Sequence, residues 1–177
     1  MNDKYSVINS KYILAIALII LSLLGGMMVV SALYRKNNLG PEQPIHFSHR
    51  VHVTDKQISC FVCHEGATDT KHAGVPPMRT CMLCHSRIIP QHPEIQKVHK
   101  SYNLKIPVHW NKVGEKLPDY VFFNHAVHVA QKIDCSVCHG NIKEMDRVKQ
   151  VNEFDMNFCV KCHQENKAST DCYTCHR

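Results

Sequence analysis

The apolar residues of this chain are concentrated near its N-terminus, in one stretch that contains no charged residue. Residues 12–34 read YILAIALIILSLLGGMMVVSALY, and these 23 positions exceed the roughly 20 residues that a helix needs to cross a bilayer. Tyr12 and Tyr34 stand at its two edges, where aromatic residues are common in membrane helices. The pattern therefore predicts a transmembrane helix over 12–34. A signal peptide cleaved after Ala32 is the alternative.

The rest of the chain, residues 35–177, shows a different pattern, in which prolines interrupt the sequence at short intervals. All eight prolines lie beyond residue 40. Because proline breaks regular structure, we expect short helices, long irregular connections and little or no sheet. The expected fold class is mainly α with extensive irregular coil, preceded by one N-terminal transmembrane helix.

Cysteine and histidine in this second part recur in one motif. The chain has ten cysteines, and all of them fall in five Cys-x-x-Cys-His motifs. In this motif two thiols add across the vinyl groups of a haem, and the His is placed under the iron as its proximal ligand. We therefore expect a multihaem cytochrome c built round five stacked haems. The five haem c groups (iron) would be covalently attached through Cys60, Cys63, Cys81, Cys84, Cys135, Cys138, Cys159, Cys162, Cys172 and Cys175, with proximal ligands His64, His85, His139, His163 and His176.

Other uses of paired cysteines do not fit this arrangement. A disulfide framework gives no reason for a His after every second Cys. A structural zinc site needs two half-sites for each metal, and five identical units are not required. A thioredoxin-like redox pair occurs once, near a βαβ pattern. The motifs therefore favour c-type haem over all three alternatives.

The first four motifs belong to an internal repeat, in which each unit contains two motifs. Phe47-Ser48-His49-x-x-His52 precedes the first motif, and Phe123-Asn124-His125-x-x-His128 precedes the third. Four matched positions are offset by 75 to 78 residues, which indicates duplication of one unit. We expect a cytoplasmic N-terminus over 1–11 and a periplasmic pentahaem domain over 35–177, because covalent haem attachment in bacteria takes place outside the cytoplasmic membrane. Its parts would be modules 45–85 and 119–163, a linker 86–118, and residues 164–177 with the fifth motif.

A six-coordinate haem also needs a distal ligand, and the repeat supplies histidines for that role. His residues at i and i+3 share one face of a helix. We therefore expect the first His of each element to ligate the haem of its own module and the second to reach a haem elsewhere, which would tie the two together. Phe47 and Phe123 would pack on porphyrin edges or form part of the core. The four expected distal ligands are His49, His52, His125 and His128.

One distal ligand stays open after these four are assigned. Met145 and Met156 are candidates, and a Met ligand would raise the potential of its haem; core packing is the alternative role for both. For a lone His a surface or packing role is more common than ligation. The remaining His candidates are His46, His72, His92, His99 and His109.

The basic composition does not indicate nucleic-acid binding. The formal charge is +6. Without Lys4, Lys11 and Asp3, the 21 basic and 15 acidic residues become 19 and 14, a net charge of +5. Five haems would bring about ten propionate charges and take this part of the chain to roughly −5. No basic run interleaved with aromatic residues is present either.

The first module resembles class III multihaem cytochromes c, and the second half resembles a more specific family. Residues 106–163 are similar to the pentahaem cytochrome c subunit of bacterial alternative complex III. One departure is Asn157-Phe158, where relatives often carry Gly-Trp. The likeness is carried by Trp110 with Val113, Leu117-Pro118-Asp119, the Phe-Asn-His-x-x-His element, the Gly after the third motif, Met145, and Met156-x-x-Cys159.

This resemblance implies an electron-transfer subunit with no catalytic residues of its own. The implied role is to pass electrons from an iron–sulfur subunit toward a monohaem cytochrome c or an oxidase, in a quinol-oxidising respiratory complex of the bacterial inner (cytoplasmic) membrane. Polytopic quinone-binding subunits and membrane lipid would be further partners. Two alternatives are a membrane-anchored quinol dehydrogenase that feeds a periplasmic reductase, and a multihaem reductase. An open iron ligated by Lys is typical of such reductases, whereas all five motifs here end in His.

Overall fold

The computed structural model describes residues 10–38, 40–114 and 116–176. The chain divides into two compact units, Met1–Leu39 and Gly40–Arg177. Each unit is described separately below.

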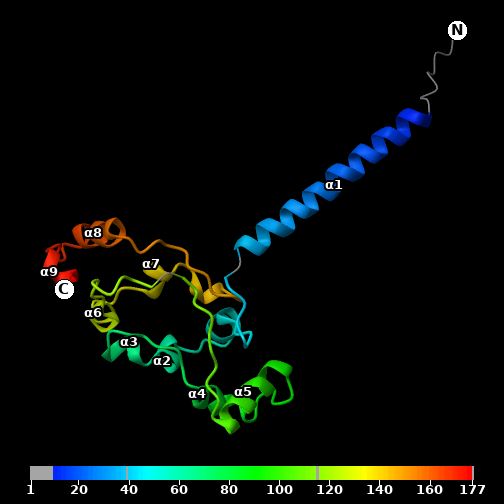
Figure 1. Cartoon of the computed structure of the whole chain (residues 1–177). Helices are drawn as coiled ribbons and strands as arrows, with labels where there is room; N and C mark the ends of the chain where they lie inside the picture. Colours follow the sequence, from blue (N-terminus) through cyan, green and yellow to red (C-terminus); the bar gives the residue numbers. More distant parts are fainter. Residues whose placement is uncertain (1–9, 39, 115, 177) are drawn as a thin grey trace. The chain divides into compact units, whose positions relative to one another are not determined.

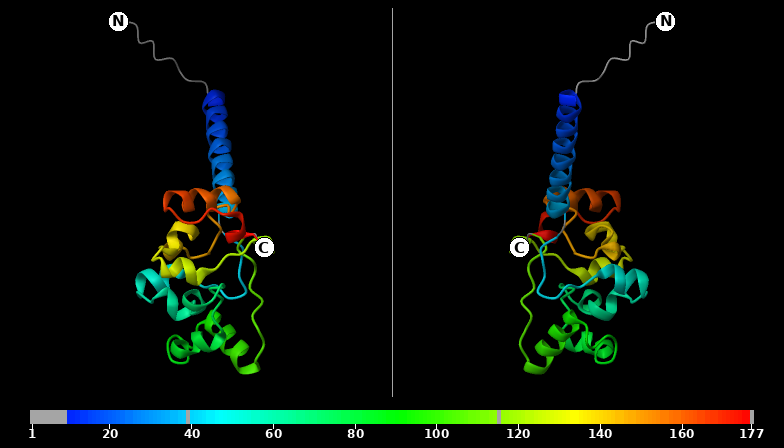
Figure 2. Two further views of the ribbon diagram at one scale, coloured as in Figure 1. Left: turned by 90° about the vertical axis from the view of Figure 1, so that its left-hand side faces the viewer. Right: turned by 90° about the vertical axis from the view of Figure 1, so that its right-hand side faces the viewer.

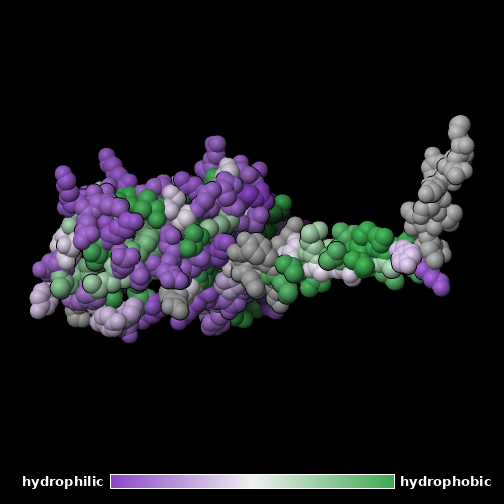
Figure 3. All heavy atoms as spheres, turned by 90° about the horizontal axis from the view of Figure 1, so that it is seen from above, coloured by the Kyte–Doolittle hydropathy of each residue, from purple (hydrophilic) through white to green (hydrophobic). Residues whose placement is uncertain are grey.

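The first unit is a single long helix. Helix α1 (Ser10–Asn38) has 29 residues, and its segment Lys11–Leu33 is long and apolar enough to cross a membrane. None of that segment is buried against the protein, and its surface is almost entirely hydrophobic (Figure 3). The helix is compatible with a single-pass anchor, and the predicted span of 12–34 differs from this segment by one residue at each end. Insertion into a membrane stays a prediction.

The second unit is built from short helices and irregular segments (Figure 1). Among its described residues no strand is present, and the nearest feature is an isolated antiparallel bridge between Val121 and His176. The prediction of a mainly helical fold with much coil is confirmed. The elements are η1 (Arg50–Asp55), α2 (Cys60–Cys63), α3 (Gly66–Asp69), α4 (Met78–His85), α5 (Pro93–Leu104), α6 (His125–Ala130), α7 (Cys135–His139), η2 (Ile142–Glu144), α8 (Met156–Glu165) and α9 (Cys172–Cys175).

These helices follow one another along the unit. Helices α4 and α5 lie at one end, α8 and α9 lie at the other, and α2, α3, α6 and α7 lie between them (Figures 1 and 2). Helix α3 of the first module packs against α6 of the second. The two modules are therefore in direct contact, and the C-terminal segment extends the second one.

Reciprocal hydrogen bonds join the two modules. The backbone N–H of His125 donates to Lys71 O (3.3 Å), in the segment after the first motif. In the other direction, the N–H of His49 donates to Met145 O (3.0 Å), in the segment after the third motif. The next residue, Arg50, also forms an ion pair with Asp146 at 3.1 Å. Each histidine element is thus held by the segment that follows the first motif of the other module.

The apolar core is small and lies beside the second motif. Ile45, Ile95 and Val98 are buried together, and few other residues of the described chain are buried. Partly buried residues that pack against this cluster are Met78, Cys81, Met82, Val108 and Trp110. Two residues of the cluster come from α5, so this helix anchors the second motif.

Helix α5 contradicts the expectation that the linker 86–118 is irregular. It has 12 residues, more than any other helix described in residues 40–176. His92 caps it by accepting from the N–H of Glu94, and Pro93 occupies the first turn, where its missing N–H costs nothing. Ile95, Val98 and Ser101 are buried on one face at helical spacing. The prolines flank this helix, so they punctuate the linker without preventing regular structure.

Candidate haem-binding sites

Each Cys-x-x-Cys-His motif forms a helical turn. Three of these turns begin directly after a polar cap, because Ser59, Asp134 and Asp171 each accept a hydrogen bond from a backbone N–H two residues on. One turn places cysteines at i and i+3 on the same side of the helix. All ten cysteines are free thiols, so each motif presents two thiols side by side followed by an imidazole.

The first and third motif histidines each face another imidazole in nearly parallel orientation. The ring centres of His49 and His64 are 6.4 Å apart with planes at 2°. Those of His125 and His139 are 6.4 Å apart with planes at 5°. Two metal–nitrogen bonds of about 2.0 Å, with about 1.1 Å from each nitrogen to its ring centre, would separate two axial imidazoles by about 6.2 Å. The observed spacing therefore fits one iron between each pair.

The second and fourth motif histidines face the second His of the same elements. His52 lies opposite His85 at 6.0 Å between ring centres, and His128 lies opposite His163 at 6.0 Å. Both pairs lie within one module, 45–85 or 119–163, so the second His lies opposite the other motif of its own module. Ligation by these histidines stays a prediction. One short helical element thus presents two imidazoles to two consecutive motifs in each module.

Phenylalanine holds these histidine elements in shape. The Phe47 ring stacks on His52 at 4.4 Å and meets the edge of His49 at 4.9 Å. The repeat reproduces this arrangement, because Phe123 stacks on His128 at 4.6 Å. Each phenylalanine therefore orients the two imidazoles of its own element, which are three residues apart in the sequence.

Most of the paired imidazoles have their Nδ1 engaged by a backbone carbonyl. A His that donates from Nδ1 keeps the lone pair of Nε2 free for a metal, and such partners also fix the orientation of the ring. The Nδ1 of His49 is buried without a partner. The engaged Nδ1 atoms and their carbonyl partners, in order of distance, are those of His163 with Ser169 O (2.6 Å), His64 with Gly74 O (2.7 Å), His52 with Ser48 O and His128 with Asn124 O (2.8 Å), His125 with Lys71 O (2.9 Å) and His85 with Ile88 O (3.1 Å).

Burial favours the neutral imidazole in two of these pairs. Burial, with smaller contributions from the nearby His64 and His52, lowers the pKa of His49 to about 4. Burial also lowers the pKa of His139, with His125 and His64 contributing. A neutral imidazole is the form that ligates a metal. At neutral pH these rings are therefore ready to bind iron without losing a proton.

The five motifs are not arranged in space in the order of the sequence. Thiols of different motifs lie close to one another. Burial raises the pKa of several of these thiols, and the charge of a neighbouring thiol from another motif adds to the effect. The motifs therefore follow one another as second, first, third, fourth and fifth, in agreement with the order of the helices in Figures 1 and 2. The neighbouring thiols are Cys63 with Cys84, Cys60 with Cys135, Cys138 with Cys162, and Cys159 with Cys175.

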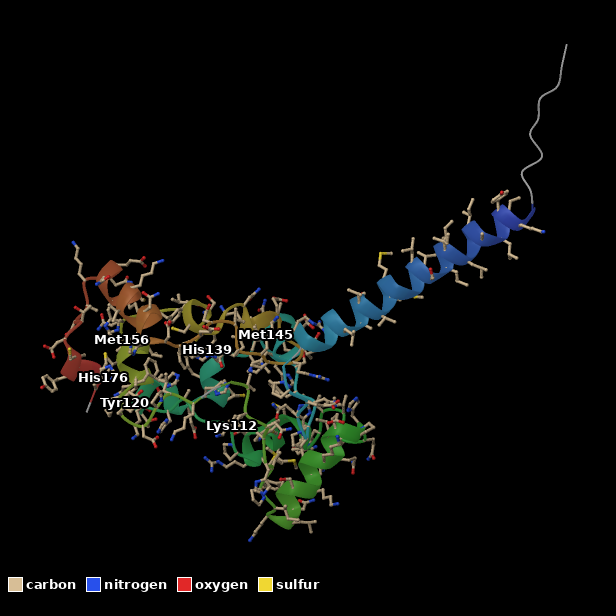
Figure 4. All side chains as sticks on the ribbon, turned by 45° about the horizontal axis from the view of Figure 1, so that its top comes forward. Lys112, Tyr120, His139, Met145, Met156 and His176 are labelled. Carbon is tan, nitrogen blue, oxygen red and sulfur yellow. The ribbon has the colours of Figure 1, made fainter. Side chains whose placement is uncertain are left out.

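The fifth motif has different surroundings. The ring nearest to His176 is that of Tyr120, at 5.9 Å between centres, and Phe122 N–H donates to Cys175 O at 2.7 Å. Figure 4 shows Met156 at the same end of the unit as His176 and Tyr120, and Met145 away from them. Met156 is 71% exposed. No pattern in the sequence indicated Tyr120, because its contact with His176 depends on how the C-terminal segment folds back.

The remaining His candidates are engaged elsewhere or exposed. His99 Nε2 lies 2.9 Å from the backbone oxygen of His85, and His92 caps α5. His46 lies beside Glu42 and Glu94 at 3.8 Å and 3.9 Å. His72 and His109 are exposed. None of these five rings is recorded opposite a motif histidine among the described residues.

Comparison with known proteins gives two matches. Residues 121–177 match the family model described as cytochrome c7 and related cytochrome c. The chain is also 31% identical, over an aligned length of 163, to a protein of Nitratidesulfovibrio vulgaris (strain Hildenborough) named menaquinone reductase, multiheme cytochrome c subunit. This alignment covers 77% of each chain.

Proposed function

Because this chain belongs to the multihaem cytochrome c family, we propose that it is a membrane-anchored electron-transfer subunit that holds five haem c groups. The haems, when bound, supply iron centres that accept and release single electrons. The protein contributes thioether attachment, axial ligands and the environment that sets each potential. The observation that carries the proposal is the set of four imidazole pairs, with ring centres 6.0–6.4 Å apart.

The proposed complex exchanges electrons with the quinone pool. The name of the Nitratidesulfovibrio relative supports a quinone-linked membrane complex. The resemblance to alternative complex III supports quinol oxidation, with electrons passing from an iron–sulfur subunit through this chain to cytochrome c or an oxidase. Helix α1 would anchor the chain in the inner membrane and leave residues 35–177 in the periplasm.

A haem count and a quinol assay test this proposal. We expect a pyridine haemochrome assay of the full chain to return five haem equivalents per polypeptide, since every motif has two free thiols. We also expect a quinol analogue to reduce the haems only when the membrane partner subunits are present. A count far below five would reject the pentahaem assignment. Reduction of the isolated subunit would identify a self-sufficient quinol dehydrogenase instead.

We assign the fifth distal ligand to Met156. In the first module the equivalent residue, Met78, packs against the core that contains α5. The second module has no counterpart of α5 among its described residues, and the fifth motif follows α8 instead. Met156 and Cys159 share a face of α8, and the Cys159 thiol lies near Cys175. Met145 is placed differently, since its carbonyl accepts from His49 and Arg50.

Replacing Met156 by leucine is expected to remove the spectroscopic signature of one methionine-ligated haem. The near-infrared magnetic circular dichroism band of thioether ligation should disappear, and the potential of that haem should fall, because a Met ligand raises it. Leucine keeps the apolar volume, so attachment of the haem should persist. The matched control is Met145→Leu, which should leave the band unchanged. A band that survives in Met156→Leu and disappears in Met145→Leu would reverse the assignment.

A further inference from the structure

The segment around α5 carries an excess of positive charge. Residues 86–114 contain five basic residues and one acidic residue, Glu94. That carboxylate is already engaged, because it lies 2.7 Å from Lys97 Nζ and accepts from the N–H of His46. Residues 153–176, at the opposite end of the unit, contain four acidic and two basic residues. The two ends therefore differ in sign.

Helix α5 presents this charge from a fixed position beside the second motif. Its inner face, with Ile95 and Val98, is buried on the core that includes Cys81. His99, on the same helix, lies 2.9 Å from the backbone oxygen of His85. These contacts hold the helix against the second motif, so its outer residues cannot move far from the expected haem.

The outer surface combines lysines with exposed apolar side chains. A hollow of about 150 Å³ is lined by Lys97, Lys100, Ser101, Ile106, Pro107 and Val108. Leu104 and Ile106 are 58% and 53% exposed. Lys100 and Lys105 are exposed, and neither forms an ion pair within the described part of the chain. An apolar centre with an unpaired charged rim is the composition of a protein interface whose partner has the opposite charge.

The surface on α5 lies beside the motif that ends the spatial series. The second motif lies in α4, at one end of the spatial series of motifs, and α5 packs against it (Figures 1 and 2). The terminal motif of a relay is where electrons enter or leave. In the described residues that follow α6 no helix equivalent to α5 is present, so the haem-binding repeat does not require it. Lys112, labelled in Figure 4, adds charge on the segment that returns from α5.

We propose that α5 and the segment 105–108 form a docking surface for an acidic redox protein, which exchanges electrons with the haem of the second motif. This inference rests on the proposed electron-transfer function. Opposite charge accelerates association and fixes orientation, and it does so less as salt concentration rises. The hollow lined by Lys97 and Lys100 accepts the apolar stem of an acidic side chain, and Lys100 binds its carboxylate, since Lys97 is paired with Glu94.

Charge reversal on the full-length holoprotein tests the docking surface. The probe is a flavodoxin, an acidic soluble redox protein, and the readout is its Kd at low and at physiological salt. The variant Lys100→Glu/Lys105→Glu should weaken binding by about tenfold and flatten the salt dependence. The matched control, Lys132→Glu/Lys167→Glu, changes two exposed lysines away from α5 and should change Kd less than about twofold. Haem content and spectra should stay unchanged in both variants, because all four lysines are exposed and lie outside the five motifs.

Other outcomes would overturn the inference. Equal Kd values for the two variants would show that this surface does not bind the acidic protein. Preferential binding of the full-length holoprotein to phosphatidylglycerol over phosphatidylcholine vesicles that is lost in Lys100→Glu/Lys105→Glu, without flavodoxin binding, would identify a lipid surface instead. Either result with five haems still present would leave the proposed electron-transfer function intact. A low haem count would reject that function separately.

Discussion

Replacing His49 by alanine is expected to convert one haem of five from low-spin to high-spin and to open it to carbon monoxide. The His49 ring lies 6.4 Å from that of His64 with nearly parallel planes, and no other imidazole is recorded opposite His64 in the described residues. Without this distal ligand the iron of the first motif would be five-coordinate. Low-temperature EPR should show one high-spin signal per polypeptide, and the Soret band should shift with carbon monoxide.

The matched control is His46→Ala, three residues upstream. His46 is exposed and lies beside Glu42 and Glu94, so all haems should stay low-spin in this variant. A second variant, His49→Met, keeps a ligand at the buried position. It should stay low-spin and raise one potential by on the order of 0.1 V, a fraction of the roughly 0.8 V that axial ligands span. A His49→Ala protein without any high-spin haem would remove His49 as a ligand.

The sequence was sufficient to indicate a multihaem cytochrome c with an apolar N-terminal helix. The five motifs, the repeat and the apolar N-terminal stretch are visible in short windows, because covalent attachment and membrane length impose fixed spacings. The i and i+3 histidines indicated which residues would leave one helix face. The family comparison confirms a multihaem cytochrome c. Ligation by particular histidines, the number of haems and the alternative complex III partners stay predictions.

What the sequence did not indicate depends on contacts between distant segments. The opposition of His52 to His85 and the spatial order of the motifs follow from how the modules pack, for example through His125 and Lys71. Helix α5 was missed because prolines dominated the interpretation of the linker, although Pro93 in a first turn favours a helix. Tyr120 meets His176 only because the C-terminal segment returns to residues 121–122. None of these contacts leaves a periodic signal.

Replacing Gly140 by alanine is expected to destabilise the unit 40–177 on the order of 2–4 kcal/mol. Gly140 follows His139 directly and adopts φ 67° and ψ −165°, a region that is essentially restricted to glycine. A Cβ at this position would also stand 2.9 Å from Val151 Cγ2. The strain would fall next to His139, so the third motif should be disturbed along with the fold. Denaturant unfolding, with the EPR spectrum of the folded fraction, measures both effects.

The control for this variant separates the backbone conformation from the contact. Gly74 also has a positive φ, 77°, but a Cβ there would meet nothing within 4 Å. Gly74→Ala should therefore cost only about 1 kcal/mol. Its carbonyl accepts from His64 Nδ1, so a larger loss would mean that this hydrogen bond is also broken. If Gly140→Ala costs no more than Gly74→Ala, the contact with Val151 relaxes freely. The glycine after the third motif would then be dispensable for holding His139 opposite His125.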